Sequence, residues 1–161
     1  MENGNTKPEQ PKIENVYMPC VRPINIDMSV DPMKTLIICY DTENAFGNEV
    51  GEIFQIGCVS SLEDKFSVTM LPQGNIHWGV IKYSGVNVEV KFTSERRKYL
   101  YHSKIKEEIP SVPPLDGFKA FVEWLKNQKK KHEANNVILV AHGEKDAPTL
   151  MNNLHFYNLG N

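Results

Sequence analysis

The sequence predicts an α/β domain with a mixed sheet, in which three antiparallel strands form a meander, one parallel strand joins them, and helices flank the sheet. Three observations carry this prediction. Three β-forming runs follow one another between residues 35 and 71 with short connections. An amphipathic helical pattern follows at residues 115–131, and a second apolar run comes after it at 137–141. A strand, a helix and a strand in this order favour parallel pairing.

Length, charge and cysteine content exclude several classes of protein. The chain has 161 residues with 18 Lys and Arg against 20 Asp and Glu, so its formal charge is −2 and it forms one modest domain. The apolar runs are too short to span a bilayer, which excludes a membrane protein. The near-neutral charge means that any nucleic-acid role must come from a defined site. Three distant cysteines and the absence of a secretory signal favour an intracellular protein, cytoplasmic or nuclear.

Two regions differ in composition. Residues 1–33 are rich in Pro, Asn, Glu and Lys, and their apolar residues are too scattered to form a periodic face. We therefore expect a flexible N-terminal leader at 1–33 and a folded domain at 34–161. Within the leader, the segment 18–21 could dock on the domain, although its flanking prolines forbid a central strand.

The first strand is expected at residues 35–40, because a nearly unbroken apolar and β-branched run suits a strand that is buried on both faces. Residues 52–59 form a second strand with partial alternation, and residues 65–71 form a third with clear alternation. Cys39 and Cys58 lie within the first two strands and are expected to behave as small buried hydrophobes.

The segment 76–114 has no clear pattern, and its structure is left open. It contains a basic stretch at residues 96–106 that is interleaved with aromatic side chains. Two interpretations of this stretch stand side by side. It could hold a phosphate backbone and stack a base, or it could be the solvated face of a helix.

The C-terminal part of the chain predicts a helix, a strand and a second helix. Apolar residues recur at helical spacing after residues 113–114, with Asp116 as the expected N-cap and lysines gathering toward Lys131. The apolar run at 137–141 is predicted to be a buried strand. The last helix is expected to begin around Pro148, whose ring is tolerated in a first turn.

Acidic residues stand where the first strand ends. Residues two apart in a strand project to the same face, so Asp41 and Glu43 point the same way. Asp146 follows the second apolar strand, so its carboxylate would approach the pair if the two strands are neighbours. Two such charges about 4 Å apart cost roughly 4 kcal/mol at an effective dielectric of about 20, and a cation removes this cost. Oxygen ligands favour Mg²⁺ or Mn²⁺, the ions that serve phosphodiester cleavage.

These segments follow an order that is typical of one family of nucleases. Residues 40–43, YDTE, precede the strand at 52–59. Residues 68–86 and the helical segment 118–125 come next, and residues 139–150, LVAHGEKDAPTL, close the series. In order and spacing they resemble the motifs of the DEDD 3′-to-5′ exonucleases, which have the ribonuclease-H-like fold.

The resemblance implies a metal-dependent 3′-to-5′ exonuclease, or the N-terminal part of one, that uses Mg²⁺ or Mn²⁺. Its partner would be the 3′ end of a single-stranded nucleic acid, either RNA or DNA. The implied catalytic residues and metal ligands are Asp41, Glu43 and Asp146. The implied substrate contacts are Thr42, Asn44 and His142.

The sequence departs from the family pattern at three places. Ser84 and Gly143 stand where the family usually has His and Asn. No counterpart of the family's last strand and last helix precedes Asn161, so we expect an incomplete fold whose open sheet edge permits self-association. The alternative function is therefore an inactive exonuclease-like module that binds RNA or a protein partner.

Each candidate residue also has a structural interpretation. Asp41 and Glu43 could simply be the polar end of a strand. Asp146 could cap the final helix, and His142 could be a hydrogen-bonded structural residue. These alternatives remain open at the level of the sequence.

Overall fold

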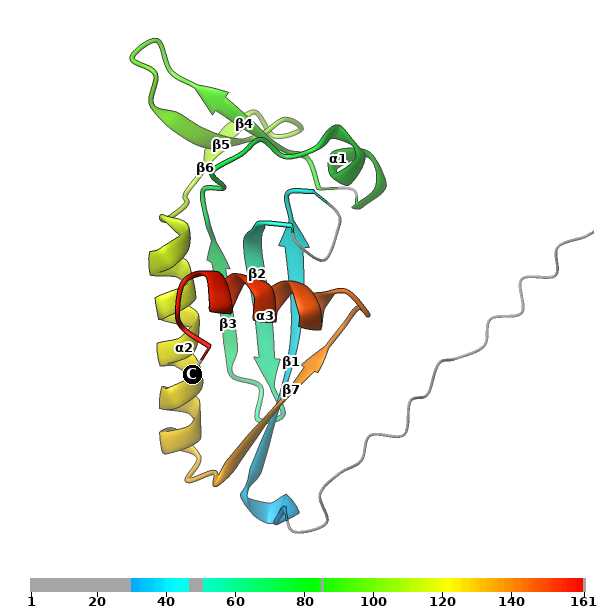
Figure 1. The fold of residues 1–161 in the computed structure, drawn as a ribbon, viewed down its shortest axis with the longest axis vertical. Coiled ribbons are helices and arrows are strands. Elements are labelled where there is room, and N and C mark those ends of the chain that lie inside the picture. The colour runs from blue at the N-terminus through cyan, green and yellow to red at the C-terminus, as the bar shows by residue number, and fades with distance from the viewer. Residues whose placement is uncertain (1–29, 47–50, 85, 161) are drawn as a thin grey trace, which may run out of the picture.

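The computed structural model describes residues 30–46, 51–84 and 86–160 (Figure 1). The expected leader therefore lies outside the described residues up to residue 29, and so does the expected docking segment 18–21. A short 3₁₀ helix, η1 (Pro32–Lys34), precedes the first strand, and Asp31 caps it by accepting a hydrogen bond from the backbone N–H of Met33.

A four-stranded mixed sheet forms the centre of the fold. Its strands are β1 (Thr35–Asn44), β2 (Ile53–Ser60), β3 (Lys65–Thr69) and β7 (Asn136–Ala141). Their order is β3-β2-β1-β7. The first three strands pair antiparallel, and β7 pairs in parallel with β1. The mixed sheet expected from the sequence is therefore confirmed.

Strand β1 extends beyond its predicted end at residue 40. Its backbone stays paired with β2 through Asp41, Thr42 and Glu43, and the register shifts at a bulge only between Glu43 and Asn44. The acidic residues consequently lie inside the strand, where pairing holds the backbone in place, and not in the turn that follows.

Two helices cover one face of the sheet, and α3 crosses β1 and β2 in Figure 1. They are α2 (Pro114–Lys131) and α3 (Asp146–Phe156). Between them and the sheet lies a core that includes Leu36, Ile38, Phe118, Phe121 and Leu150. Burying such side chains fully stabilises the fold by about 1.5–3 kcal/mol each. In the described part of the chain, no helix has the length and apolar character needed to cross a membrane.

Both helix starts differ from prediction. Pro113 holds the N-cap position of α2 without a side-chain cap, and Asp116 lies in the first turn, where its charge still suits the helix dipole. Helix α3 begins at Asp146, two residues before Pro148, and Lys145 is its N-cap residue. An acidic residue is as favourable inside a first turn as at the cap, so composition alone places the start of a helix only approximately.

In the described part of the chain, no helix covers the second face of the sheet, which we call the open face. On β1, Ile37 is 43% exposed and Cys39 is exposed as well. On β7, Ile138 and Val140 pair with Ile37 and Cys39 and are 37% and 39% exposed, and Leu139, on the other face, is 37% exposed. The prediction that the first strand is buried on both faces is therefore wrong, as are the predictions of a buried strand at 137–141 and a buried Cys39, whereas Cys58 is buried as expected. The helices lie on one face only, and β7 is an edge strand.

A smaller subdomain follows β3. It contains α1 (Trp78–Ser84) and a second antiparallel sheet of β4 (Val88–Phe92), β5 (Lys98–His102) and β6 (Glu107–Ile109). The middle of the basic, aromatic stretch is the strand β5, paired on both sides, with turns before and after it, so its interpretation as a helix face is wrong. Because side chains alternate along a strand, Leu100 lies in a second small core, whereas Tyr99 and Tyr101 lie on the other face of β5.

Candidate active site

The carboxylates of β1 lie on the open face of the sheet, near the point where the neighbouring strand β7 ends. Asp41 is exposed and Glu43 is partly buried, whereas Thr42 between them is buried on the helix side. Pairing of Asp41 with Gly57 and of Glu43 with Gln55 holds this stretch of backbone extended. The prediction that Asp41 and Glu43 share a face is confirmed.

His142 follows β7 and meets Asp41. Its backbone N–H donates a 2.9 Å hydrogen bond to the carbonyl oxygen of Tyr40. Its ring Nδ1 lies 3.5 Å from Oδ1 of Asp41, with the two side chains 83% and 59% exposed. An ion pair this exposed contributes little to stability, so Asp41 can turn to another ligand at small cost.

Asp146 is buried at the start of α3, with an exposed fraction of 7%. Its Oδ1 accepts a 2.6 Å hydrogen bond from the hydroxyl of Thr42, and its Oδ2 accepts a 2.6 Å hydrogen bond from the backbone N–H of Gly143. The carboxylate thus ties the helix start to the centre of β1. It is bonded to the loop before the helix and does not occupy the N-cap position.

The glycine at position 143 has a physical reason in this arrangement. A Cβ atom built there would lie 2.9 Å from Oδ2 of Asp146, closer than real Cβ contacts allow. Gly143 therefore lets the carboxylate approach the backbone, and a side chain at this position would push Asp146 away.

The charges of the other two carboxylates act on Glu43. The pKa of Glu43 is raised first by burial, then by the charge of Asp41, and then by the charge of Asp146. Burial, followed by the charges of Asp146 and Cys58, raises the pKa of Tyr40 to about 12, so this phenol stays protonated at neutral pH. Within the described residues, no three or more His, Cys, Asp or Glu side chains are arranged so that they could hold a metal ion.

The predicted substrate contacts occupy different surroundings. Thr42 faces the helices, and its hydroxyl is engaged by Asp146. Asn44 follows the bulge at the end of β1 and pairs with Ile53. His142 is the most exposed of the three and stands beside Asp41.

A groove on the open face passes beside Asp41 and was not expected from the sequence. Its volume is about 350 Å³, and its lining includes Cys39, Gly57, Val59 and Lys65. Nothing lies within 4 Å of the position that a Cβ of Gly57 would take, so the absent side chain leaves the floor of the groove open. The only indication in the sequence was a glycine in a strand interior.

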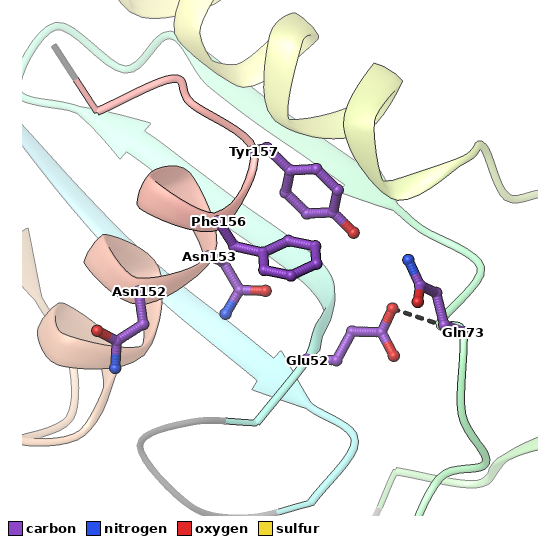
Figure 2. Close-up of a pocket in the computed structure, with 6 residues that line it drawn as sticks. All are labelled: Glu52, Gln73, Asn152, Asn153, Phe156 and Tyr157. Atoms are coloured by element: carbon purple, nitrogen blue, oxygen red, sulfur yellow. Dashed lines mark hydrogen bonds between the residues drawn. The ribbon is translucent and has the colours of Figure 1, made fainter.

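A second pocket lies between the C-terminal half of α3 and the loop after β3 (Figure 2). Its volume is about 270 Å³, and its lining is formed by Glu52, Gln73, Asn152, Asn153, Phe156 and Tyr157. Glu52 accepts hydrogen bonds from the backbone N–H groups of Gln73 at 2.7 Å and Gly74 at 3.3 Å. Burial and the charge of Glu52 raise the pKa of Tyr157. The lining residues come from segments far apart in the chain, so no local pattern predicted this pocket.

Protein-family models and curated proteins were compared with the chain, and neither comparison finds a match.

Proposed function

We propose that the chain is a metal-dependent 3′-to-5′ exonuclease with a ribonuclease-H-like fold, or the N-terminal part of one. Asp41, Glu43 and Asp146 would hold Mg²⁺ or Mn²⁺. The observation that carries the proposal is the pair of carboxylates, Asp41 and Glu43, on one face of β1 beside the end of β7, where His142 meets Asp41. The raised pKa of Glu43 agrees with it, because burial first and then the charges of Asp41 and Asp146 disfavour its ionised form. Converging acids destabilise a fold unless a proton or a cation neutralises them, and carboxylate oxygens are the ligands that these cations prefer.

Asp41 and Glu43 offer a hard divalent cation oxygen donors on the open face, and Asp146, which lies on the helix side with Thr42, would complete the set only after the structure adjusts. Asp41 is exposed and weakly paired, so its carboxylate can rotate toward Glu43. Each oxygen of Asp146 accepts one hydrogen bond, from Thr42 or from Gly143, and has a second lone pair. A bound cation would supply an activated water and stabilise the leaving oxygen of a phosphodiester. The protein would hold Asp146 in position through Thr42 and Gly143.

A second candidate is an inactive exonuclease-like module that binds RNA or a protein partner. One observation favours it. Both oxygens of Asp146 are satisfied by Thr42 and Gly143 in a buried position, so this carboxylate also serves a purely structural role, holding α3 against β1. In that case the acidic residues of β1 would be the remains of a metal site.

The two candidates differ in a cleavage assay on a labelled single-stranded RNA and a labelled single-stranded DNA. We expect the unmodified chain to shorten one of them from the 3′ end in Mn²⁺ or Mg²⁺, and EDTA to stop the reaction. Asp41→Asn and Glu43→Gln should abolish cleavage. Glu123→Gln, an exposed carboxylate on α2, is the matched control and should leave the activity unchanged.

Binding of the metal is tested separately by thermal unfolding. A ligand that binds only the folded state raises the midpoint as its concentration grows. We expect Mn²⁺ to stabilise the unmodified chain and not Asp41→Asn. Cleavage that survives Asp41→Asn would exclude the assigned metal ligands. Binding of RNA without cleavage or a Mn²⁺ response would favour the inactive module.

A further inference from the structure

The outer face of the small sheet places two tyrosine rings beside two cations. Tyr99 and Tyr101 are partly buried and lie on the face of β5 opposite to the buried Leu100. Their ring centroids are 6.5 Å apart, and the planes are almost perpendicular at 86°. Lys91 Nζ lies 3.4 Å from the ring centroid of Tyr101, and the guanidinium of Arg97 lies 5.3 Å from that of Tyr99.

We propose that this face binds single-stranded nucleic acid, with bases stacked on Tyr99 and Tyr101 and the phosphates held by the neighbouring cations. We name the surface formed by Lys91, Arg97, Tyr99 and Tyr101 the tyrosine face. A basic surface that presents aromatic rings is the general means of binding single strands without sequence preference, because every base has a face that can stack. The choice of a nucleic acid as ligand rests on the proposed function.

Charge complementarity supports this ligand. Residues 88–109 contain six Lys and Arg against four Glu, a net charge of +2, whereas the whole chain carries −2. Arg96 is exposed in the turn before β5, and Lys104 and Lys106 are exposed in the turn after it. Within the described residues, no acidic side chain forms an ion pair with these three cations. At about 3.3 Å per residue, the two turns lie roughly 20 Å apart, so phosphates can be held at both ends of the tyrosine pair.

Two acidic residues, Glu89 and Glu108, contact the cations of the tyrosine face but leave them accessible. Glu89 and Lys91 are 3.8 Å apart with side chains 41% and 39% exposed, a pair that a phosphate can displace. Glu108 receives two hydrogen bonds from Arg97, at 2.7 and 2.8 Å, which orient the guanidinium beside Tyr99. Arg97 has five N–H donors, so three remain for a phosphate.

The test is fluorescence anisotropy with labelled oligo(U) and oligo(dT) in EDTA, where no metal-dependent cleavage occurs. The double variant Tyr99→Ala/Tyr101→Ala should lose roughly tenfold or more in affinity, the effect expected when a stacked base loses its ring. Tyr99→Phe/Tyr101→Phe keeps the rings and should bind like the unmodified chain. Phe92→Ala removes another aromatic ring, 59% exposed at the end of β4, and is the matched control that should bind normally.

The contribution of charge is measured from the salt dependence of binding. Lys91→Gln and Arg96→Gln should each make the slope of log affinity against log salt shallower by about 0.7, the value for one phosphate contact to a single strand. Lys129→Gln on α2 makes the same change of charge far along the chain and should leave the slope unaltered. Stronger binding of oligo(U) or of oligo(dT) identifies the natural strand, and either result supports the proposal.

Two results would overturn the proposal. One is a Tyr99→Ala/Tyr101→Ala variant that unfolds at the temperature of the unmodified chain and binds with unchanged affinity. The other is failure of the unmodified chain to bind either oligonucleotide in EDTA. Binding in EDTA needs no metal whereas cleavage does, so failure of the exonuclease proposal and failure of the tyrosine face are distinguishable.

Discussion

The hydroxyl of Thr42 donates a 2.6 Å hydrogen bond to Oδ1 of Asp146, a residue 104 positions away in the chain. Both side chains are buried, with exposed fractions of 8% and 7%. This bond joins the strand that carries the candidate metal ligands to the helix that carries the third carboxylate. Any change at Thr42 is therefore transmitted to the candidate active site.

Thr42→Val removes this hydroxyl while keeping the shape of the side chain. Because Oδ1 of Asp146 would then be buried without its partner, we expect the free energy of unfolding to fall by about 1–3 kcal/mol. Urea denaturation measures the change. Thr69→Val on β3, where no buried carboxylate accepts a bond, should change stability by less than about 0.5 kcal/mol. Equal losses in the two variants would contradict the importance of the Thr42 bond.

Gly143→Ala tests the close approach of Asp146 to the backbone. The added Cβ would lie 2.9 Å from Oδ2, so the carboxylate must move and lose its bond to the N–H of residue 143. We expect a loss of about 1 kcal/mol in unfolding free energy and a smaller stabilisation by Mn²⁺. Gly57→Ala meets no atom within 4 Å and serves as the control. A Gly143→Ala variant as stable as Gly57→Ala would show that Asp146 can move without cost.

Asp64 should make stability depend on pH. It lies in the turn between β2 and β3, and its hydrogen bonds to Lys131 at 2.6 Å and His132 at 2.7 Å lower its pKa below the ordinary value of 3.8. A lowered pKa in the folded state stabilises the protein above the unfolded-state pKa, and this contribution is lost as the pH falls through the folded-state pKa.

Asp64→Asn should therefore be less stable than the unmodified chain near neutral pH, and the difference should vanish in acid well below pH 3.8. Urea denaturation across this range measures both curves. Glu123→Gln, at an exposed position on α2, should follow the unmodified chain at every pH. A difference between Asp64→Asn and the unmodified chain that stays constant with pH would refute the linkage.

The edge strand β7 should promote self-association. Its sequence NVILVA has no charge or proline to block pairing with another strand, and three of its apolar side chains are more than a third exposed. We expect Ile138→Lys to lower the average molar mass measured by light scattering, because a charge on an edge strand opposes pairing. Met151→Lys, which adds the same charge to an exposed position on α3, should leave the mass unchanged.

Much of the candidate site was predictable because its geometry is local. Alternation along a strand is enough to place Asp41 and Glu43 on one face, and the succession of strand, helix and strand is enough to pair β7 with β1. The pocket beside Glu52 and Tyr157 was not predictable, because its walls come from residues about a hundred positions apart.

Local periodicity and turn-forming residues determine which segments of this chain become strands and helices, and in what order. They do not determine which faces are covered. The apolar run of β7 predicts a buried strand, yet β7 forms the edge of the sheet and stays partly exposed, because no described strand pairs with its outer side. The surroundings of Asp146 were likewise decided only in three dimensions, since its partner Thr42 comes from a distant strand and hydrogen bonds depend on proximity in space.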